Sequence, residues 1–373
     1  MSDLAKPDLT KSASAEPDST GPGAPEPPEG AGKPAAGPAA ARPMVRLLPG
    51  RQVHSLGLVV VLGLLCVVGT VTSSNFLTSS NIVNILTSAA VIGVITVGQT
   101  FVIIGGGIDL SVGAIVAVAS VWCTTVATQD YGLGGMLFTA VIVGCVVGLL
   151  NGVLIAYGKI AAFITTLAMM ASARGVAERL SDRQSQVVTV SSFNDIATKK
   201  FLGIPLLVYL MAAIVVVGWL LLNRTTFGRR TFAVGGNPEA ARLAGIAVRR
   251  HTMLLYLLSG ACCGIAAIML TARTTSGASN LGNLYELDSI AAVIIGGTLL
   301  AGGRGSLIGS ILGVLVFTTI TNIFVLNNLT TDIQEIAKGG IIIVAVLLQR
   351  PRTRGTRGPR GTRPAESVKG TSA

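Results

Sequence analysis

The fold follows from residues 86–106, which read LTSAAVIGVITVGQTFVIIGG. These 21 residues contain no Asp, Glu, Lys or Arg. An α-helix rises about 1.5 Å per residue, so a run of this length reaches across the ~30 Å hydrocarbon core of a bilayer. The stretch therefore predicts a membrane-spanning helix, and similar apolar runs recur on both sides of it.

The whole chain has the composition of a membrane protein. Of its 373 residues 50% are apolar and only 12% are charged, and the mean hydropathy is +0.69. A soluble domain of this size needs more charged residues on its surface. We expect an all-α fold, because a helix satisfies its own backbone hydrogen bonds in lipid. We predict a polytopic membrane protein with about ten transmembrane helices, at residues 53–73, 86–106, 110–128, 136–157, 161–180, 205–222, 252–272, 288–302, 306–326 and 333–349.

Positive charge is distributed unevenly between the predicted spans. With the N-terminus inside, 21 of the 28 Lys and Arg fall in cytoplasmic segments. Because cytoplasmic loops of membrane proteins are enriched in Lys and Arg, this bias places both termini on the cytoplasmic side of a bacterial plasma membrane. The net charge of +11 therefore indicates contact with membrane lipid, and we expect no nucleic-acid partner.

Composition divides the chain into three parts. Residues 1–43 are rich in Ala, Pro, Gly and Ser and are predicted to form a disordered cytoplasmic tail. Residues 44–349 form the predicted transmembrane domain. Residues 350–373 are predicted to be a disordered basic tail that anchors to anionic lipid.

Two glycine-rich segments suggest an internal repeat. Glycines recur at every fourth residue from 144 to 152 and again from 305 to 313. Small residues at this spacing line one helix face and let two helices approach closely. The segments lie in the fourth and ninth predicted spans, which would cross the membrane in opposite directions. We predict an inverted repeat of spans two to five and seven to ten; the alternative is ordinary packing of Gly-rich helices.

The sequence contains no motif for catalysis or ATP hydrolysis. Gly152, Gly158 and Lys159 approach a phosphate-binding loop, but the spacing is wrong and Ile160 replaces the required Ser or Thr. The five cysteines lie in apolar runs and the two histidines at span edges, so we expect neither a disulfide framework nor a metal site. We expect a non-catalytic chain without a cofactor of its own. If it moves solute against a gradient, ATP and Mg²⁺ must act on another chain.

A break separates the second and third spans at residues 105–113, which read GGGIDLSVG. Three glycines disfavour a helix here, and Asp109 precedes the third span. We expect the Asp109 carboxylate to cap the free N–H groups of the following helix and to suit the positive end of its dipole. The other interpretation is that this broken backbone shapes a solute path.

The longest predicted cytoplasmic loop between spans, residues 223–251, contains a short helix. Asn237 is a good N-cap, Pro238 suits the first helical position, and Glu239 in the first turn suits the helix dipole. Small residues follow as far as Gly245, which can end the helix. We expect this helix to dock on a partner protein; the alternative is a basic loop that lies on anionic lipid.

Charged residues within or beside the spans are costly in lipid and need partners. Arg174 and Glu178 lie four residues apart, and Glu335 and Lys338 lie three apart, so each pair is predicted to form an ion pair on one helix face. Asp288 begins the eighth span. The alternative interpretation is that these charges contact the solute.

Several segments together resemble the ribose, xylose and galactose type permeases of bacterial ABC importers. The resemblance covers about residues 75–349 and rests on NIVNIL at 81–86, GQTFVI at 98–103, GGIDLSVG at 106–113, Asn151-Gly152, FITTL at 163–167, Arg174-Gly175, residues 227–245 and Lys338-Gly339. Two features depart from the family pattern. No Ile-x-Leu-Pro follows the loop, and Thr166-Leu167-Ala168 stands where Thr-Leu-Gly is expected.

The resemblance implies that residues 44–349 are a permease domain that translocates a small sugar, a monosaccharide. It also implies three partners: an ABC ATPase, an extracytoplasmic sugar-binding protein, and a second permease copy that is either identical or a close paralogue. The loop would dock on the ATPase through Gly236, Asn237, Glu239, Ala240, Ala241 and Gly245. Our candidates for the solute path are Gly106, Gly107, Asp109, Ser111, Asn151 and Lys338.

Two rival functions fit parts of the same pattern. One is a permease for branched-chain amino acids or another small polar solute. The other is a proton-coupled secondary transporter, which would need a titratable carboxylate or His deep in the pathway. His54 and His251, the two histidines of the chain, lie at span edges.

Overall fold

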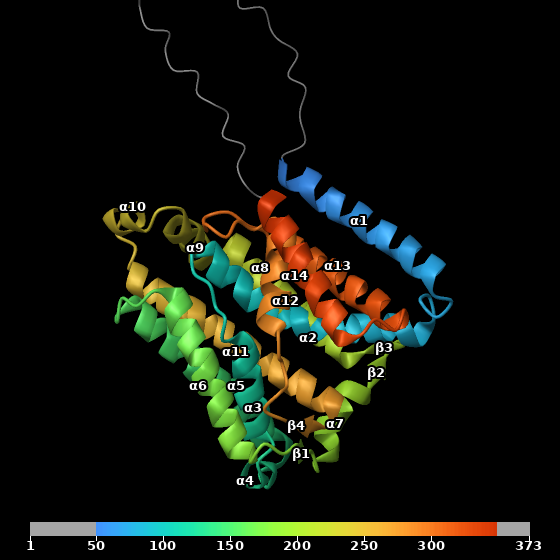
Figure 1. Ribbon diagram of the computed structural model, residues 1–373. Helices are drawn as coiled ribbons and strands as arrows, with labels where there is room; N and C mark the ends of the chain where they lie inside the picture. Colours follow the sequence, from blue (N-terminus) through green and yellow to red (C-terminus); the bar gives the residue numbers. More distant parts are fainter. Residues whose placement is uncertain (1–49, 349–373) are drawn as a thin grey trace, which may run out of the picture. The chain divides into compact units, whose positions relative to one another are not determined.

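Helices make up almost all of the structure, as the apolar runs predicted. The computed structural model describes residues 50–348, so the predicted tails at 1–43 and 350–373 lie outside the described residues. Figure 1 shows the helices of this range, which are α1 (Gly50–Thr72), α2 (Ser79–Ile104), α3 (Val112–Cys123), α4 (Val126–Gln129), α5 (Gly132–Ala156), α6 (Ala162–Ser181), α7 (Ser191–Thr198), α8 (Leu206–Arg224), α9 (Thr226–Gly236), α10 (Pro238–Leu243), α11 (Val248–Thr274), α12 (Tyr285–Ile295), α13 (Leu307–Leu326) and α14 (Thr331–Leu348).

Short strands connect the loops at some helix ends. β1 (Gln186–Val187) pairs antiparallel with β4 (Ser276–Gly277), and β2 (Lys200–Phe201) pairs antiparallel with β3 (Ile204–Pro205). Since β1 follows α6 and β4 follows α11, the first pair ties together loops that are far apart in sequence.

Each of the ten predicted spans contains a helix, but the helices differ in their ability to cross a membrane. Six are long and apolar enough to do so: α1, α2, α5, α8, α11 and α13. α3 and α12 have only 12 and 11 residues. At 1.5 Å per residue they reach about 18 Å, short of the ~30 Å core. α6 and α14 are long enough but each carries three charges, Arg174, Glu178 and Arg179 in α6 and Asp332, Glu335 and Lys338 in α14. The count of ten spans stays a prediction.

Two of the predicted spans are shorter than expected, because backbone breaks end them. The span at 110–128 is divided between α3 and the four-residue α4, where Thr125 accepts a hydrogen bond from the Thr128 N–H and begins a new helix. The span at 288–302 ends early, at Ile295, because Gly296 and Gly297 follow and Gly297 has φ of +83°. Both short helices therefore stop within the membrane-spanning part of the chain.

One helix in the loop between α8 and α11 and one between α6 and α8 were missing from the prediction. α9 precedes the expected short helix, and Thr225 caps it by accepting a hydrogen bond from the Gly228 N–H. α7 lies in the loop that follows β1. Both helices are short and lack a long apolar run, so hydropathy alone could not identify them.

The packing of the helices supports the predicted internal repeat. In this repeat α2, α3, α5 and α6 correspond in order to α11, α12, α13 and α14. Contacts between these helices have counterparts when each helix is replaced by the one that corresponds to it. α2 packs on α12 and α13, as α11 packs on α3 and α5; α3 packs on α6, as α12 packs on α14. α2 and α11 pack on each other, and the largest buried core lies around them and α3, with Phe101, Ile115 and Tyr256.

The two glycine segments that suggested the repeat are not equivalent in packing. Gly144, Gly148 and Gly152 of α5 face α11, and a Cβ atom added at Gly148 would lie 2.9 Å from the Gly260 Cα. In α13, Gly309 and Gly313 instead face the backbone of α12. In the repeat, α11 corresponds to α2 and not to α12, so equivalent glycines of α13 would face α2. The shared glycine spacing therefore reflects close helix packing in each half and is not itself evidence for the repeat.

Candidate solute path and docking helix

Asp109 lies in the break between α2 and α3 and is fully buried. Its Oδ1 accepts hydrogen bonds from the Ser111 N–H (3.0 Å) and the Ser111 hydroxyl (2.6 Å). Its Oδ2 accepts one from the Ser259 hydroxyl of α11 (3.1 Å). The prediction that Asp109 caps the first turn of α3 is wrong, because Ser111 occupies the N-cap position and the carboxylate is bonded to that residue alone in the segment. Asp109 instead holds the break against α11.

Side chains from three other positions secure the same break. The Asn151 amide of α5 donates to the Ser111 hydroxyl (2.8 Å), the Gln99 amide of α2 donates to the Asp109 carbonyl (3.2 Å), and the Tyr256 hydroxyl of α11 donates to the Ile108 carbonyl (3.2 Å). The structure thus brings together three predicted path residues, Asp109, Ser111 and Asn151. All three have no exposed surface, so what it shows is a buried network that fixes the backbone; their contact with solute stays a prediction.

Four glycines form a junction where the ends of distant elements meet: Gly106, Gly235, Gly302 and Gly303. Gly303 of the α12–α13 loop donates its N–H to the carbonyl of Ile104 at the end of α2 (2.8 Å). A Cβ atom at Gly235 would collide with that carbonyl and lie 2.7 Å from the Gly303 nitrogen. The backbones therefore touch without side chains between them. This glycine junction joins α9, and through it α10, to both halves of the repeat.

A small cavity of about 280 Å³ lies beside the junction and contains the predicted residues Gly106 and Gly107. Pro238 of α10 and Arg249 of α11 also line it. Gly107 packs under Tyr256, where an added Cβ atom would lie 2.5 Å from the hydroxyl oxygen. Gly106 and Gly107, both predicted path residues, are thus close to α10, which contains Pro238, and away from Lys338.

The predicted short helix is present as α10, which we call the docking helix. The Asn237 carboxamide oxygen accepts hydrogen bonds from the N–H groups of Glu239 (3.1 Å) and Ala240 (3.0 Å), and Pro238 occupies the first turn. Gly245 follows the helix with φ of +80°, a conformation that favours glycine. The local structure expected from the sequence is confirmed.

The outer surface of the docking helix is not the surface that the sequence suggested. Ala241 is only 4% exposed, so its side chain fixes the helix in place and is closed to a partner. Leu243 is 76% exposed and is the large apolar side chain of this short helix. Sequence reasoning missed Leu243, although a single bulky apolar residue among alanines could have identified it.

Glu239 and Arg242 form an ion pair beside this apolar side chain. The Arg242 Nε lies 3.2 Å from both carboxylate oxygens of Glu239. The hydrogen bond from this guanidinium, together with its charge, lowers the pKa of the Glu239 carboxyl below its ordinary value. The exposed face of the docking helix therefore combines one apolar side chain with a charged pair at its edge.

Lys338 of α14 forms an ion pair with Asp288 of α12, with Nζ at 3.1 and 3.2 Å from the two carboxylate oxygens. The predicted pair of Lys338 with Glu335 is therefore wrong. The predicted pair of Arg174 with Glu178 is also wrong: Arg174 donates to the backbone carbonyls of Ser279 and Leu281, and Glu178 pairs with Arg183 at 3.2 Å. Tertiary partners from other elements displaced the partners that helical spacing offered.

The ion pair of Lys338 lines a cavity of about 450 Å³ between α2, α12, α13 and α14, which we call the polar cavity. The reciprocal amide bonds of Asn81 and Asn322, at 3.0 and 2.7 Å, cross its wall from α2 to α13. Arg273, at the end of α11, is an exposed residue of the same lining. The polar side chains of the cavity are Asn81, Asn84, Ser88, Arg273, Tyr285, Asp288, Thr318, Thr321, Asn322 and Lys338.

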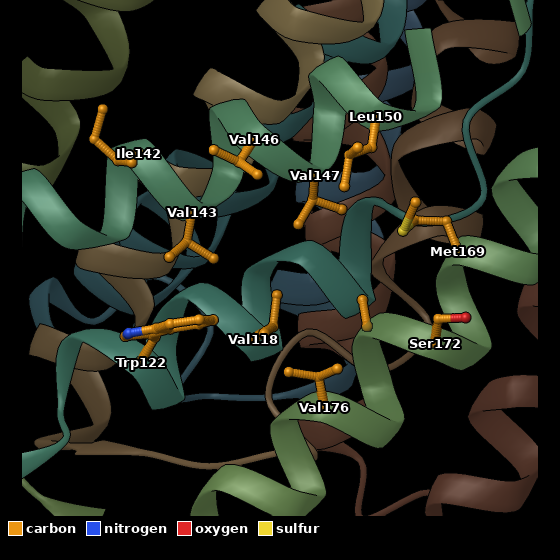
Figure 2. A pocket seen from close by; sticks show the side chains of 11 residues that line it. Val118, Trp122, Ile142, Val143, Val146, Val147, Leu150, Met169, Ser172 and Val176 are labelled. Atoms are coloured by element: carbon orange, nitrogen blue, oxygen red, sulfur yellow. The ribbon is translucent and has the colours of Figure 1, made fainter. Parts of the chain in front are cut away.

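A second cavity, of about 430 Å³, lies between α3, α5 and α6, and we call it the apolar cavity. Figure 2 shows side chains of the three helices around the space, among them Val118, Val143 and Val147, whereas the Ser172 hydroxyl is directed away from it. Its lining consists of Val118, Trp122, Ile142, Val143, Val146, Val147, Leu150, Met169, Ser172, Ala173 and Val176.

Comparison with known proteins gives a family for this arrangement. A family model described as "Branched-chain amino acid transport system / permease component" matches residues 81–346. The ribose import permease protein RbsC of Bacillus subtilis (strain 168) is 39% identical over 315 residues, which are 81% of this chain and 97% of the relative. RbsC of Escherichia coli (strain K12) is 35% identical over 300 residues, 79% of this chain and 93% of the relative.

A relative with a different printed sugar has similar coverage. The L-arabinose ABC transporter permease protein AraH of Azospirillum brasilense is 36% identical over 300 residues, 80% of this chain and 88% of the relative. No solved structure matches the chain significantly. The resemblance expected from the sequence motifs is confirmed, and the chain belongs to the family of branched-chain amino acid transport system permease components, in a group with sugar import permeases.

Proposed function

We propose that this chain is the membrane-spanning permease subunit of an ABC importer that moves a monosaccharide across the bacterial plasma membrane. The relatives are named for ribose and L-arabinose, which favours a sugar over the branched-chain amino acid of the family description. The chain supplies the pathway, and a separate ATPase supplies the energy. ATP and Mg²⁺ belong to that partner, because the full sequence lacks a phosphate-binding loop motif.

The observation that carries this proposal is the docking helix and its connection to the glycine junction. A helix of six residues is not stable alone in water, so it exists here because neighbours hold it and a cap begins it. Its exposed face offers Leu243 to a partner. The helix that precedes it, α9, touches the backbone of α2 and of the α12–α13 loop at Gly235. A push on the helix by an ATPase would reach both halves of the repeat.

The remaining partners follow from this mechanism. A second permease copy, identical or closely related, would complete the pathway, and an extracytoplasmic binding protein would deliver the sugar. Alternating access would be driven by the two nucleotide sites of the ATPase. The exposed faces of α6 and α14, both charged and rich in exposed residues, suit contact with these partners better than contact with lipid.

The docking role is tested by Leu243→Glu, which places a charge on the exposed face without disturbing the cap or the buried Ala241. We expect retention of the ATPase on the purified permease to fall about tenfold or more, because truncating or charging a central apolar anchor costs at least about 1.4–2 kcal/mol of binding. ATP-dependent sugar uptake in vesicles should fall with it. Leu202→Glu is the matched control, since Leu202 is 83% exposed in a different loop.

Two outcomes of this experiment decide the matter. Normal ATPase retention and uptake in Leu243→Glu would show that the docking helix is not the contact. Equal losses in Leu202→Glu would show that any added surface charge harms the assembly. Loss in Leu243→Glu alone supports the proposal.

We also propose that both termini are cytoplasmic, on the distribution of Lys and Arg. A reporter fused after residue 349 should then be found inside the cell. One inserted at residues 190–200, in the region of α7, should be found outside. A cytoplasmic result at both positions would contradict this orientation and the ten-span arrangement.

A further inference from the structure

The polar cavity contains polar groups that have no partner within the described part of the chain. The Thr318 hydroxyl is buried, and the residue is 5% exposed, yet it makes no hydrogen bond. The side chains of Asn84, Ser88 and Tyr285 line the same cavity and have no hydrogen-bond partner among residues 50–348. A buried hydroxyl without a partner costs about 1–3 kcal/mol, so its retention points to a ligand that completes it.

Of the three charged side chains in the cavity, Asp288 and Lys338 neutralise each other, and the exposed Arg273 remains as a cation. Asp288 and Lys338 are held by each other, and the Lys338 ammonium also lies 5.5 Å from the centre of the Phe317 ring. The Asp288 carboxylate has more acceptor positions than Lys338 occupies, since two oxygens offer about four lone-pair sites. It can therefore accept hydrogen bonds from hydroxyl groups while the ion pair stays intact. Such charge-assisted bonds are roughly twice as strong as neutral ones.

We propose that the polar cavity is a transit site for a neutral polyhydroxylated solute, which is the monosaccharide of the proposed function on which this inference rests. Asn84 and Ser88 hydrogen-bond its hydroxyls, Thr318 turns its enclosed hydroxyl toward them, and the Asp288–Lys338 pair accepts and donates. Tyr285 and apolar side chains such as Ile92 offer surface for the C–H faces of the ring. The cavity volume of about 450 Å³ lies within the usual range for small-molecule sites.

The same chemistry disfavours an amino acid. A zwitterion needs an anionic partner for its ammonium and a cationic partner for its carboxylate. Arg273 could bind the carboxylate, but the ammonium would have to take Asp288 from Lys338, and the ion pair would be lost. Breaking a buried pair is costly unless both charges find equal partners. A sugar gains hydrogen bonds from the pair without this cost.

The position of the cavity agrees with a site near the entrance of the path. Asn81, Asn84 and Ser88 belong to the first part of α2, whereas the glycine junction lies at the other end of this 26-residue helix. At 1.5 Å per residue, the two ends of α2 are about 35–40 Å apart. The solute site and the docking helix are therefore at opposite ends of α2, as delivery on one side and ATP hydrolysis on the other require.

The test is Thr318→Val, which removes the hydroxyl and keeps the shape. Because a buried hydroxyl without a partner is destabilising, its removal should raise the unfolding temperature or leave it unchanged. We expect uptake of radiolabelled D-ribose or L-arabinose at sub-saturating concentration to fall about 3- to 10-fold in the assembled importer, the effect of one lost hydrogen bond. Asn84→Ala should act in the same direction. Thr271→Val is the matched control, since Thr271 is also buried and unpartnered but lies outside this cavity.

Each result has a definite meaning. Uptake in Thr318→Val and Asn84→Ala equal to that of the natural protein would overturn the assignment of the cavity, and the sugar import function would stand. An equal fall in Thr271→Val would overturn it as well. Uptake of leucine that depends on Thr318 while ribose and arabinose uptake does not would overturn the solute class. A natural importer that takes up no monosaccharide at all would overturn this inference together with the proposed function.

Discussion

The polar cavity and the apolar cavity occupy equivalent places in the two halves of the repeat. One is lined by α12, α13 and α14, and the other by the matching helices α3, α5 and α6; α2 also lines the polar cavity, whereas its counterpart α11 does not line the apolar one. Their volumes are similar, about 450 and 430 Å³. One contains a buried ion pair and several amides, whereas the other contains Trp122, valines and one hydroxyl (Figure 2).

This difference separates what the backbone decides from what the side chains decide. A short helix beside two longer ones leaves a hollow in each half, whatever residues line it. The side chains then determine whether the hollow accepts hydroxyl groups or hydrocarbon. Duplication of the fold therefore need not duplicate the chemistry of a cavity: of these two, the polar cavity is the one that offers groups to a polar solute.

The largest effect that would test this contrast is expected at the ion pair. Lys338→Met leaves Asp288 buried and unpaired, which should lower the free energy of unfolding by about 3–5 kcal/mol. Sugar uptake should be lost as well. The measurement is thermal unfolding of the purified protein in detergent, together with vesicle uptake.

A double variant separates folding from transport at this pair. Asp288→Leu with Lys338→Met removes both charges, so most of the stability should return while uptake should not. If the double variant is no more stable than the single one, the unpaired carboxylate is not the cause of the loss. If uptake returns, the pair has no part in handling the solute.

The next effect concerns the glycine junction, where the two halves meet. Gly235→Ala places a methyl group against the Ile104 carbonyl and the Gly303 nitrogen, whereas at Gly236 the nearest atom, the Gly303 Cα, is 4.0 Å away. We expect Gly235→Ala to lower the free energy of unfolding by about 2–3 kcal/mol, in the upper part of the range for over-packing. Uptake should also fall, because both halves depend on the junction.

The adjacent glycine provides the control for this prediction. Gly236→Ala should resemble the natural protein in unfolding temperature, since an added methyl group meets no atom closer than 4.0 Å. Equal behaviour of the two variants would mean that backbone contact at the junction is not needed.

The smallest effect is expected in the apolar cavity. Val147→Asn introduces an amide without partners and should cost about 1–2 kcal/mol of stability. Uptake per folded molecule should be unchanged, since no solute passes there. Thr318→Val should show the reverse pattern, with unchanged or higher stability and reduced uptake. A folded Val147→Asn protein that transports poorly would place the apolar cavity on the solute path and remove the contrast between the two halves.

The sequence was most informative where the physical cause is local. The docking helix could be predicted because its cap, its first-turn proline and its final glycine all lie within nine residues, from Asn237 to Gly245. The all-α membrane fold could be predicted because hydropathy is a property of each run by itself. Asp109 was identified as notable because three glycines precede it, but its bond to Ser259 comes from a helix 150 residues away.

The ion pairs show why the remainder could not be predicted. Helical spacing offered Glu335 to Lys338 and Glu178 to Arg174, and it contains no information about other helices. The real partner of Lys338 lies 50 residues earlier, and the carbonyls that bind Arg174 lie more than 100 residues later. The polar cavity is likewise built from four helices, so it exists only after they pack. The exposed side chain of Leu243 could be recognised as the contact surface of α10 only once Ala241 was known to be buried.

The Asp288–Lys338 pair also has a consequence for how the chain enters the bilayer during synthesis. α12 is too short and α14 too charged to partition into lipid alone, and each carries one member of the pair. Asp288 leaves the ribosome 50 residues before Lys338, so for that interval its carboxylate lacks the ammonium group with which it pairs in the folded protein. Insertion of α12, α13 and α14 must therefore be completed as a group. A nascent chain that stops before α14 would hold an unpaired carboxylate, which the proteases that remove faulty membrane proteins could distinguish from the finished molecule.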